Sequence, residues 1–145
     1  MVLKKKESIM ILNLGEKEYD VATNIGVSYD IEQQHRKKIT KVIENIEDLT
    51  IKEMCDLMYV GVKRKNKDIT FNDFFNDIID SGISLIDLQK EFTVFITLLT
   101  SSNKTESEVR EKLEEAYNKN IEKYKNEYED ELEEYEEVLV DDEKN

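Results

Sequence analysis

Side chains suited to catalysis or metal binding are few in this sequence, and they lie far apart. His35 is the only histidine, within the polar run EQQHRKK, and no paired cysteine, serine or acidic motif lies near it. Cys55 is the only cysteine and falls among apolar neighbours, so it forms no internal disulfide and suits a reducing cytoplasm. A zinc site normally has four ligands, and one histidine with one cysteine does not supply them.

Phosphate-binding and calcium-binding patterns are also missing from the sequence. The chain has four glycines and neither GxGxxG nor GxxxxGK, so little of it can form a phosphate-binding loop. The acidic run at 141–143 can attract divalent cations loosely, but it lacks the glycine-turn spacing of a calcium loop. We therefore expect no enzyme activity, no bound cofactor and no metal site.

The pattern with the clearest chemistry is an apolar stripe within the acidic stretch KYKNEYEDELEEYEEVL, residues 123–139. Including upstream positions, the stripe comprises Val109, Leu113, Tyr117, Ile121, Tyr124, Tyr128, Leu132, Tyr135 and Leu139. Its mean step is 30/8 = 3.75 residues, nearer the 3.6 of an α-helix than the 3.5 of a left-handed coiled coil. This spacing predicts a helix over 105–138, which the like charges in ELEEYEE weaken when it is isolated.

Tyrosine combines apolar area with a polar tip and is common at protein interfaces. The candidate partner-binding residues are therefore Tyr117, Ile121, Tyr124, Tyr128, Leu132 and Tyr135. The stripe has three candidate occupants, namely the chain's own core, a symmetric neighbour, or a client protein.

Charge divides the 145 residues into two regions. The net charge is −13, of which residues 1–103 carry −3 and residues 104–145 carry −10. We expect a globular domain over 1–103 and an acidic amphipathic helical tail over 104–145. An acidic chain without a basic stripe is poorly suited to nucleic acid or anionic lipid, and the sequence has neither a signal-peptide pattern nor an apolar run of transmembrane length.

The elements expected in 1–103 are a hairpin followed by helices. Residues 8–14 and 18–23 are β-rich around Gly15, and the apolar period then lengthens to that of a helix over 27–46, with a break near 38–40. Three further helices are expected to begin after Thr50, Thr70 and Ser84, each with an acidic residue three positions later, and a polar loop is expected at 63–68. Expected inner positions are Ile31, Ile39, Val42, Ile43, Ile46, Ile51, Met54, Cys55, Met58, Val62, Phe71, Phe74, Phe75, Ile78, Leu85, Leu88, Phe92, Phe95, Ile96 and Leu99.

The expected fold is therefore α+β and mainly α, with an N-terminal β-hairpin packed on a small helical bundle and a long acidic C-terminal helix. Two strands alone are only marginally stable, so one face of the hairpin must pack on helices. Thr105 with Glu108 forms a further capping-box pattern at the start of the tail.

Two stretches of the sequence have a distinctive order of motifs, namely MILNLGEKEYDVATNIGVSYDIEQ, residues 10–33, and IENIEDLTIKEMCDLMYVGVKRKNKDITFNDFFNDII, residues 43–79. They contain a turn of the type Gly-x-Lys-Glu-Tyr, a Leu-Thr helix cap, a Met-Tyr-x-Gly-Val segment and a threonine-capped acidic helix. With these features, residues 10–100 resemble the tail assembly chaperones of long-tailed bacteriophages. Tyr59, Gly61 and Thr70 are the positions carried over, with structural roles. The first nine residues and the long acidic tail depart from the family pattern.

This resemblance implies a chaperone that binds the tape measure protein and keeps it soluble in the host cytoplasm while tube subunits polymerise, and that is absent from the mature virion. In this family a programmed frameshift commonly appends a domain that recruits the tail tube protein. The final residues Glu-Lys-Asn, 143–145, match the codons of a slippery A-AAA-AAC heptamer, so we expect the frameshift there.

Two other functional classes stay open, an acidic nucleic-acid mimic that inhibits a DNA-binding protein and a helical adaptor. The near balance of charge over 1–103 counts against the mimic.

Overall fold

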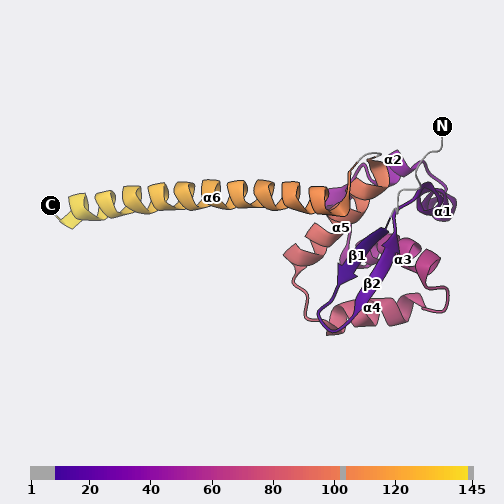
Figure 1. Cartoon of the computed structure of the whole chain (residues 1–145). Coiled ribbons are helices and arrows are strands. Elements are labelled where there is room, and N and C mark those ends of the chain that lie inside the picture. The colour runs from indigo at the N-terminus through magenta and orange to yellow at the C-terminus, as the bar shows by residue number, and fades with distance from the viewer. Residues whose placement is uncertain (1–8, 102–103, 144–145) are drawn as a thin grey trace. The chain divides into compact units, whose positions relative to one another are not determined.

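The computed structural model of the chain describes residues 9–101 and 104–143. Its elements in chain order are β1 (Ile9–Asn13), β2 (Glu18–Ala22), α1 (Ile25–His35), α2 (Ile39–Val42), a 3-10 turn (Ile46–Asp48), α3 (Ile51–Lys65), α4 (Phe71–Asp80), α5 (Leu85–Thr100) and α6 (Glu106–Glu143) (Figure 1). The predicted fold class is confirmed: the protein is α+β and mainly α, with an N-terminal hairpin and a long C-terminal helix. Within the described residues, no helix is both long and apolar enough to span a membrane.

The chain divides into two compact units, Met1–Val109 and Arg110–Asn145. The first unit extends a few residues past the boundary expected at 103, because the first turn of α6 belongs to it. Val109 in that turn is 2% exposed, and the Ile11 N–H of β1 donates to the Glu106 carboxylate at 3.2 Å. The Ser-Ser-Asn joint at 101–103 falls largely outside the described residues.

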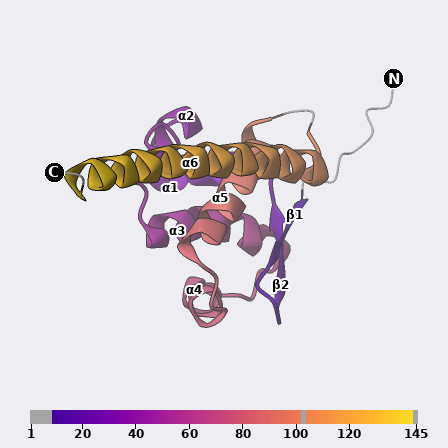
Figure 2. The same ribbon diagram turned by 90° about the vertical axis from the view of Figure 1, so that its left-hand side faces the viewer.

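The hairpin packs one face on helices. β1 and β2 are antiparallel, with Met10 opposite Val21 and Leu12 opposite Tyr19, and these four side chains are buried. Gly15 has φ +92°, a conformation that glycine adopts without strain, and its N–H donates to the Asn13 side chain at 2.8 Å. Helix α3 lies against β2, and α5 lies against β1 (Figure 2).

Helix α3 begins with the predicted capping box. The Glu53 N–H donates to the Thr50 hydroxyl at 3.1 Å, and the Thr50 N–H donates to the Glu53 carboxylate at 3.2 Å. Four predicted inner residues are buried, as are three more, Leu57, Val60 and Gly61, whereas Ile51 is exposed. The loop expected at 63–68 begins later, because α3 continues to Lys65 and places three basic residues at its negative end.

The helical segment expected over 27–46 is interrupted, as predicted, but the break comes earlier than 38–40 and the second helix ends at Val42. Helix α1 ends at His35, and Arg36 adopts a left-handed conformation with φ 52°, which turns the chain before the short α2. Of the predicted inner residues in this segment only Ile31 is fully buried. The other four, Ile39, Val42, Ile43 and Ile46, are only half-buried, because the turn at Arg36 interrupts the helical phase that would have aligned them.

Helices α4 and α5 begin at the predicted residues. The Asp73 N–H donates to the Thr70 hydroxyl and the Asp87 N–H to the Ser84 hydroxyl, each at 3.1 Å. Phe74 and Ile78 are buried, whereas the predicted inner residues Phe71, Phe75 and Leu99 are half-buried. Leu85, also expected inside, is exposed in the first turn of α5, and Val94 is buried instead.

Candidate functional site

All six candidate partner-binding residues lie on α6. From Tyr117 to Tyr135 they span 18 residues in five steps, a mean of 3.6, so they share one face of the helix. The Thr105 hydroxyl accepts from the Glu108 N–H at 3.3 Å, which caps the start of the helix as predicted. The six positions therefore lie in one row along the helix in the second unit, and we call this row the α6 stripe.

The central part of the α6 stripe is open to solvent. Its exposed fractions are 38% for Ile121, 72% for Tyr124, 63% for Tyr128 and 43% for Leu132. Tyr117 is half-buried, and the side chain of Tyr135 lies outside the described residues. Large apolar side chains that stay exposed in a contiguous row mark interaction surfaces, so the stripe is the strongest candidate for binding in the second unit.

Charge is distributed very unevenly along α6. Residues 110–125 carry five basic and four acidic side chains, whereas residues 126–143 carry eleven acidic and no basic ones. The N-terminal half is thus close to neutral and the C-terminal half is strongly negative. Any helix that lies along the stripe meets these two different environments in succession.

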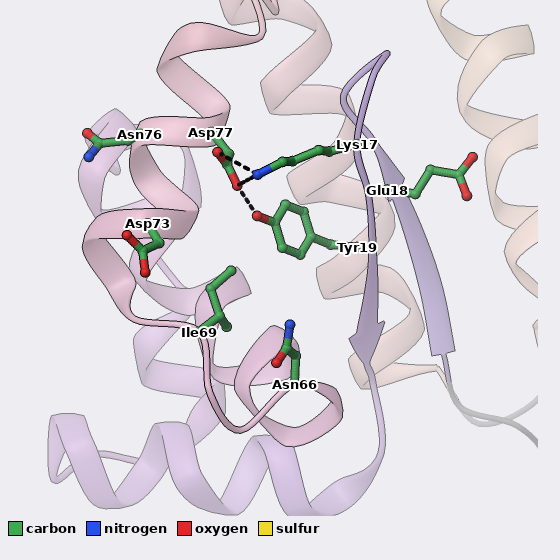
Figure 3. A pocket seen from close by; sticks show the side chains of 8 residues that line it. All are labelled: Lys17, Glu18, Tyr19, Asn66, Ile69, Asp73, Asn76 and Asp77. Carbon is green, nitrogen blue, oxygen red and sulfur yellow. Dashed lines mark hydrogen bonds and ion pairs between the residues drawn. The ribbon is translucent and has the colours of Figure 1, made fainter.

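A polar cluster in the first unit links the hairpin to α4. Lys17 Nζ lies 3.2 and 3.3 Å from the two carboxylate oxygens of Asp77, and the Tyr19 hydroxyl donates to the same carboxylate. They line an open pocket of about 480 Å³ together with Asp73 and Asn66, among others (Figure 3). The cluster closes one end of the hairpin onto the helix.

The pKa shifts in this cluster favour a structural role. The pKa of Tyr19 is raised because its ring is buried and because its hydroxyl donates to Asp77. The pKa of Asp77 is lowered by the hydrogen bond from Tyr19 and then by Lys17. Near neutral pH the phenol therefore stays protonated and the carboxylate stays ionised, which keeps the hydrogen bond and the ion pair in place.

The only histidine and the only cysteine of the chain differ in their exposure to solvent. His35 is exposed at the end of α1, whereas Cys55 is fully buried in α3, where burial and the nearby Asp56 raise the pKa of its thiol to about 11. A thiol with that pKa is almost entirely protonated and unreactive near neutral pH. Within residues 9–101 and 104–143, no group of three His, Cys, Asp or Glu residues could hold a metal ion; the side chains of the acidic run 141–143 are not among those described.

Comparisons of the chain with protein-family models, curated proteins and solved structures find no match.

The three positions carried over from the chaperone resemblance occupy structural places. The Tyr59 hydroxyl donates to the Ile69 carbonyl at 2.7 Å, which holds the loop before α4. Gly61 lies where α3 approaches β2, so that a Cβ atom there would be 2.5 Å from the Ala22 carbonyl oxygen. Thr70 caps α4. The cluster of Lys17, Tyr19 and Asp77 was not predicted, since no local pattern links residues 58 and 60 positions apart.

Proposed function

We propose that this chain is a tail assembly chaperone of a long-tailed bacteriophage that binds the tape measure protein and keeps it soluble in the host cytoplasm. The observation that carries the proposal is the α6 stripe, an exposed row of apolar side chains on an acidic helix. The sequence resemblance over residues 10–100 supplies the family. The hairpin, the capped helices and the close approach at Gly61 are compatible with that family's pattern.

The physical match lies in the nature of the client. A tape measure protein is a long helical chain with exposed apolar stripes, which would aggregate before tube subunits surround it. A helix with its own apolar stripe can cover such a surface side by side. The eleven acidic residues at 126–143 would keep the complex soluble through net charge.

The proposed second partner is the tail tube protein, recruited by a longer product of the frameshift expected at 143–145. In that product α6 separates the chaperone core from the appended domain. The gene sequence tests this step alone. An overlapping −1 reading frame and the codons GAA-AAA-AAC at this site support it, and any other codons or no such frame remove it.

The chaperone proposal is tested by producing the chain together with the tape measure protein encoded downstream of it. We expect the client to move from the insoluble to the soluble fraction and to copurify with the chain. A tape measure protein that stays insoluble beside a well-folded chain contradicts the proposal. Absence of such a gene from the neighbourhood also contradicts it and favours the adaptor.

The role of the stripe is tested by changing Tyr124, Tyr128 and Tyr135 together to serine. Loss of three interfacial tyrosines should weaken client binding by at least roughly 100-fold. The matched control is Tyr29→Ser, since Tyr29 is 59% exposed but lies on α1 in the first unit. The same three positions changed to phenylalanine should retain binding. Equal binding by the serine variant and the wild type would exclude the stripe from the client interface.

A further inference from the structure

The α6 stripe, together with Leu113 before it and Leu139 after it, repeats every 11 residues. Leu113, Tyr124 and Tyr135 form one series, Tyr117, Tyr128 and Leu139 a second, and Ile121 and Leu132 a third. Eleven residues in three turns give 3.67 residues per turn, close to the 3.6 of a straight α-helix. The stripe therefore runs almost parallel to the helix axis, and a second straight helix can follow it over its whole length.

The stripe also has nearly the same side chains when it is read in the opposite direction. Asn126 is the centre: Tyr124 and Tyr128 lie two residues from it, Tyr117 and Tyr135 nine, and Leu113 and Leu139 thirteen. Ile121 and Leu132 lie five and six residues away. A two-fold interface requires a surface that complements itself after rotation, and an antiparallel pair of α6 helices centred on Asn126 meets this requirement at the level of residue positions.

Charge selects the antiparallel orientation over the parallel one. In a parallel pair, residues 126–143 of both copies would lie together and bring eleven acidic side chains beside eleven others. In an antiparallel pair each of these segments lies beside residues 110–125 of the other copy, which carry five basic and four acidic side chains. The antiparallel pair avoids the repulsion between the two acidic halves.

We infer that in the free protein the α6 stripe is covered by the same stripe of a second copy, with the two helices antiparallel about Asn126. The pair removes from water the four central side chains that are 38–72% exposed in the single chain. It places Tyr124 of each copy beside Tyr128 of the other. This inference concerns the free protein and does not depend on the identity of the client.

The mass in solution is the first test. Sedimentation equilibrium of the full chain should give a dimer at micromolar concentrations, twice the 17.1 kDa of one chain. A chain that stays monomeric up to about 1 mM overturns the inference, because the stripe is then uncovered or covered within one copy.

Orientation is tested with a nitroxide label at Glu115→Cys. Glu115 is exposed and lies about 200° around the helix from Leu113, away from the stripe. It is 11 residues from Asn126, so two labels in the antiparallel dimer are separated by about 22 residues along the axis, or about 33 Å. A parallel dimer would hold the two labels within about 20 Å of each other.

The native thiol of Cys55 is buried and should not react with the label, and labelling of the wild type checks this. A short distance overturns the antiparallel arrangement.

A pair of variants connects the dimer to the stripe. Tyr124→Ser with Tyr128→Ser removes the aromatic contacts on both sides of the two-fold axis and should raise the dissociation constant of the dimer at least about tenfold. Tyr29→Ser, an exposed tyrosine in the first unit, should leave it unchanged. Equal dimerisation by the double variant and the wild type would overturn the role of the stripe.

Discussion

Replacing Gly61 by alanine should destabilise the first unit, although alanine is the better helix former. Gly61 lies in α3 beside β2, and a Cβ atom added there would be 2.5 Å from the Ala22 carbonyl oxygen and 2.6 Å from Val21 Cγ1. Ordinary van der Waals contact begins at about 3.4 Å, so α3 and β2 must separate by most of an ångström. The Ala22 oxygen belongs to the backbone of the hairpin and cannot rotate away.

Two opposing effects set the magnitude. Glycine to alanine in a helix interior stabilises by about 1 kcal/mol through backbone entropy. Overpacking in a close-packed core destabilises by about 1–3 kcal/mol, and more where backbone must move. Since the contact here is with backbone, we expect the upper end of the overpacking cost to apply, and the variant to lose a net 2 kcal/mol, roughly, after the helix-propensity gain is subtracted.

The assay is urea unfolding followed by near-ultraviolet circular dichroism, since Tyr19 is buried in the first unit and its signal depends on the packing there. Gly26→Ala is the matched control. The three atoms nearest to its added Cβ all belong to the guanidinium of Arg64, at 2.5–2.7 Å. This flexible side chain can move at the expense of its exposed ion pair with Asp30. Gly26→Ala should therefore change stability by less than about 1 kcal/mol. An unfolding midpoint for Gly61→Ala equal to or above the wild type would refute the close-approach argument.

Two further changes test the contacts that close the first unit. Asp77→Asn should lower stability at pH 7 by about 1 kcal/mol. The pKa of Asp77 is lowered in the folded protein. The wild type therefore keeps this stabilisation above the ordinary pKa of aspartate and loses it as the pH falls below about 4. The unfolding free energies of the two proteins should converge in acid, and a constant difference down to about pH 2 would contradict this. Tyr59→Phe removes the 2.7 Å hydrogen bond to the Ile69 carbonyl and should lower the unfolding free energy by about 1 kcal/mol, whereas an unchanged midpoint would show that water replaces the hydroxyl.

Local signals predicted much of the fold. The starts of three helices depend on side chains three residues apart, such as Thr50 and Glu53, and the structure shows each of these caps. The hairpin depends on alternation and on Gly15, which are also local. The break in the first helical segment was expected near 38–40, but the chain already turns at Arg36. Arg36 adopts a left-handed conformation that non-glycine residues rarely take, so the sequence did not indicate the turn there.

Contacts between distant parts of the chain were beyond sequence reasoning. The position of Asp77 beside Lys17 and Tyr19 depends on how α4 packs against the hairpin, and nothing near any of these residues indicates it. The α6 stripe is different because all its members lie on one helix, so spacing alone places them on one face. The sequence could not predict how exposed each member is, since this depends on what packs against the helix.

Truncation separates the first unit from the rest of α6. A fragment of residues 1–113 keeps Val109, which is 2% exposed, and keeps the Glu106 carboxylate that accepts from the Ile11 N–H. A fragment of 1–103 loses both and exposes the apolar surface that Val109 covers. We expect both fragments to unfold cooperatively, because the main core residues precede 103, but 1–103 should be less stable by about 2 kcal/mol. Urea unfolding of the two fragments measures this difference.

Equal stability of the two fragments would show that α6 contributes nothing to the first unit and would return the domain boundary to 103. A non-cooperative 1–113 fragment would show that the first unit needs the remainder of α6 to fold.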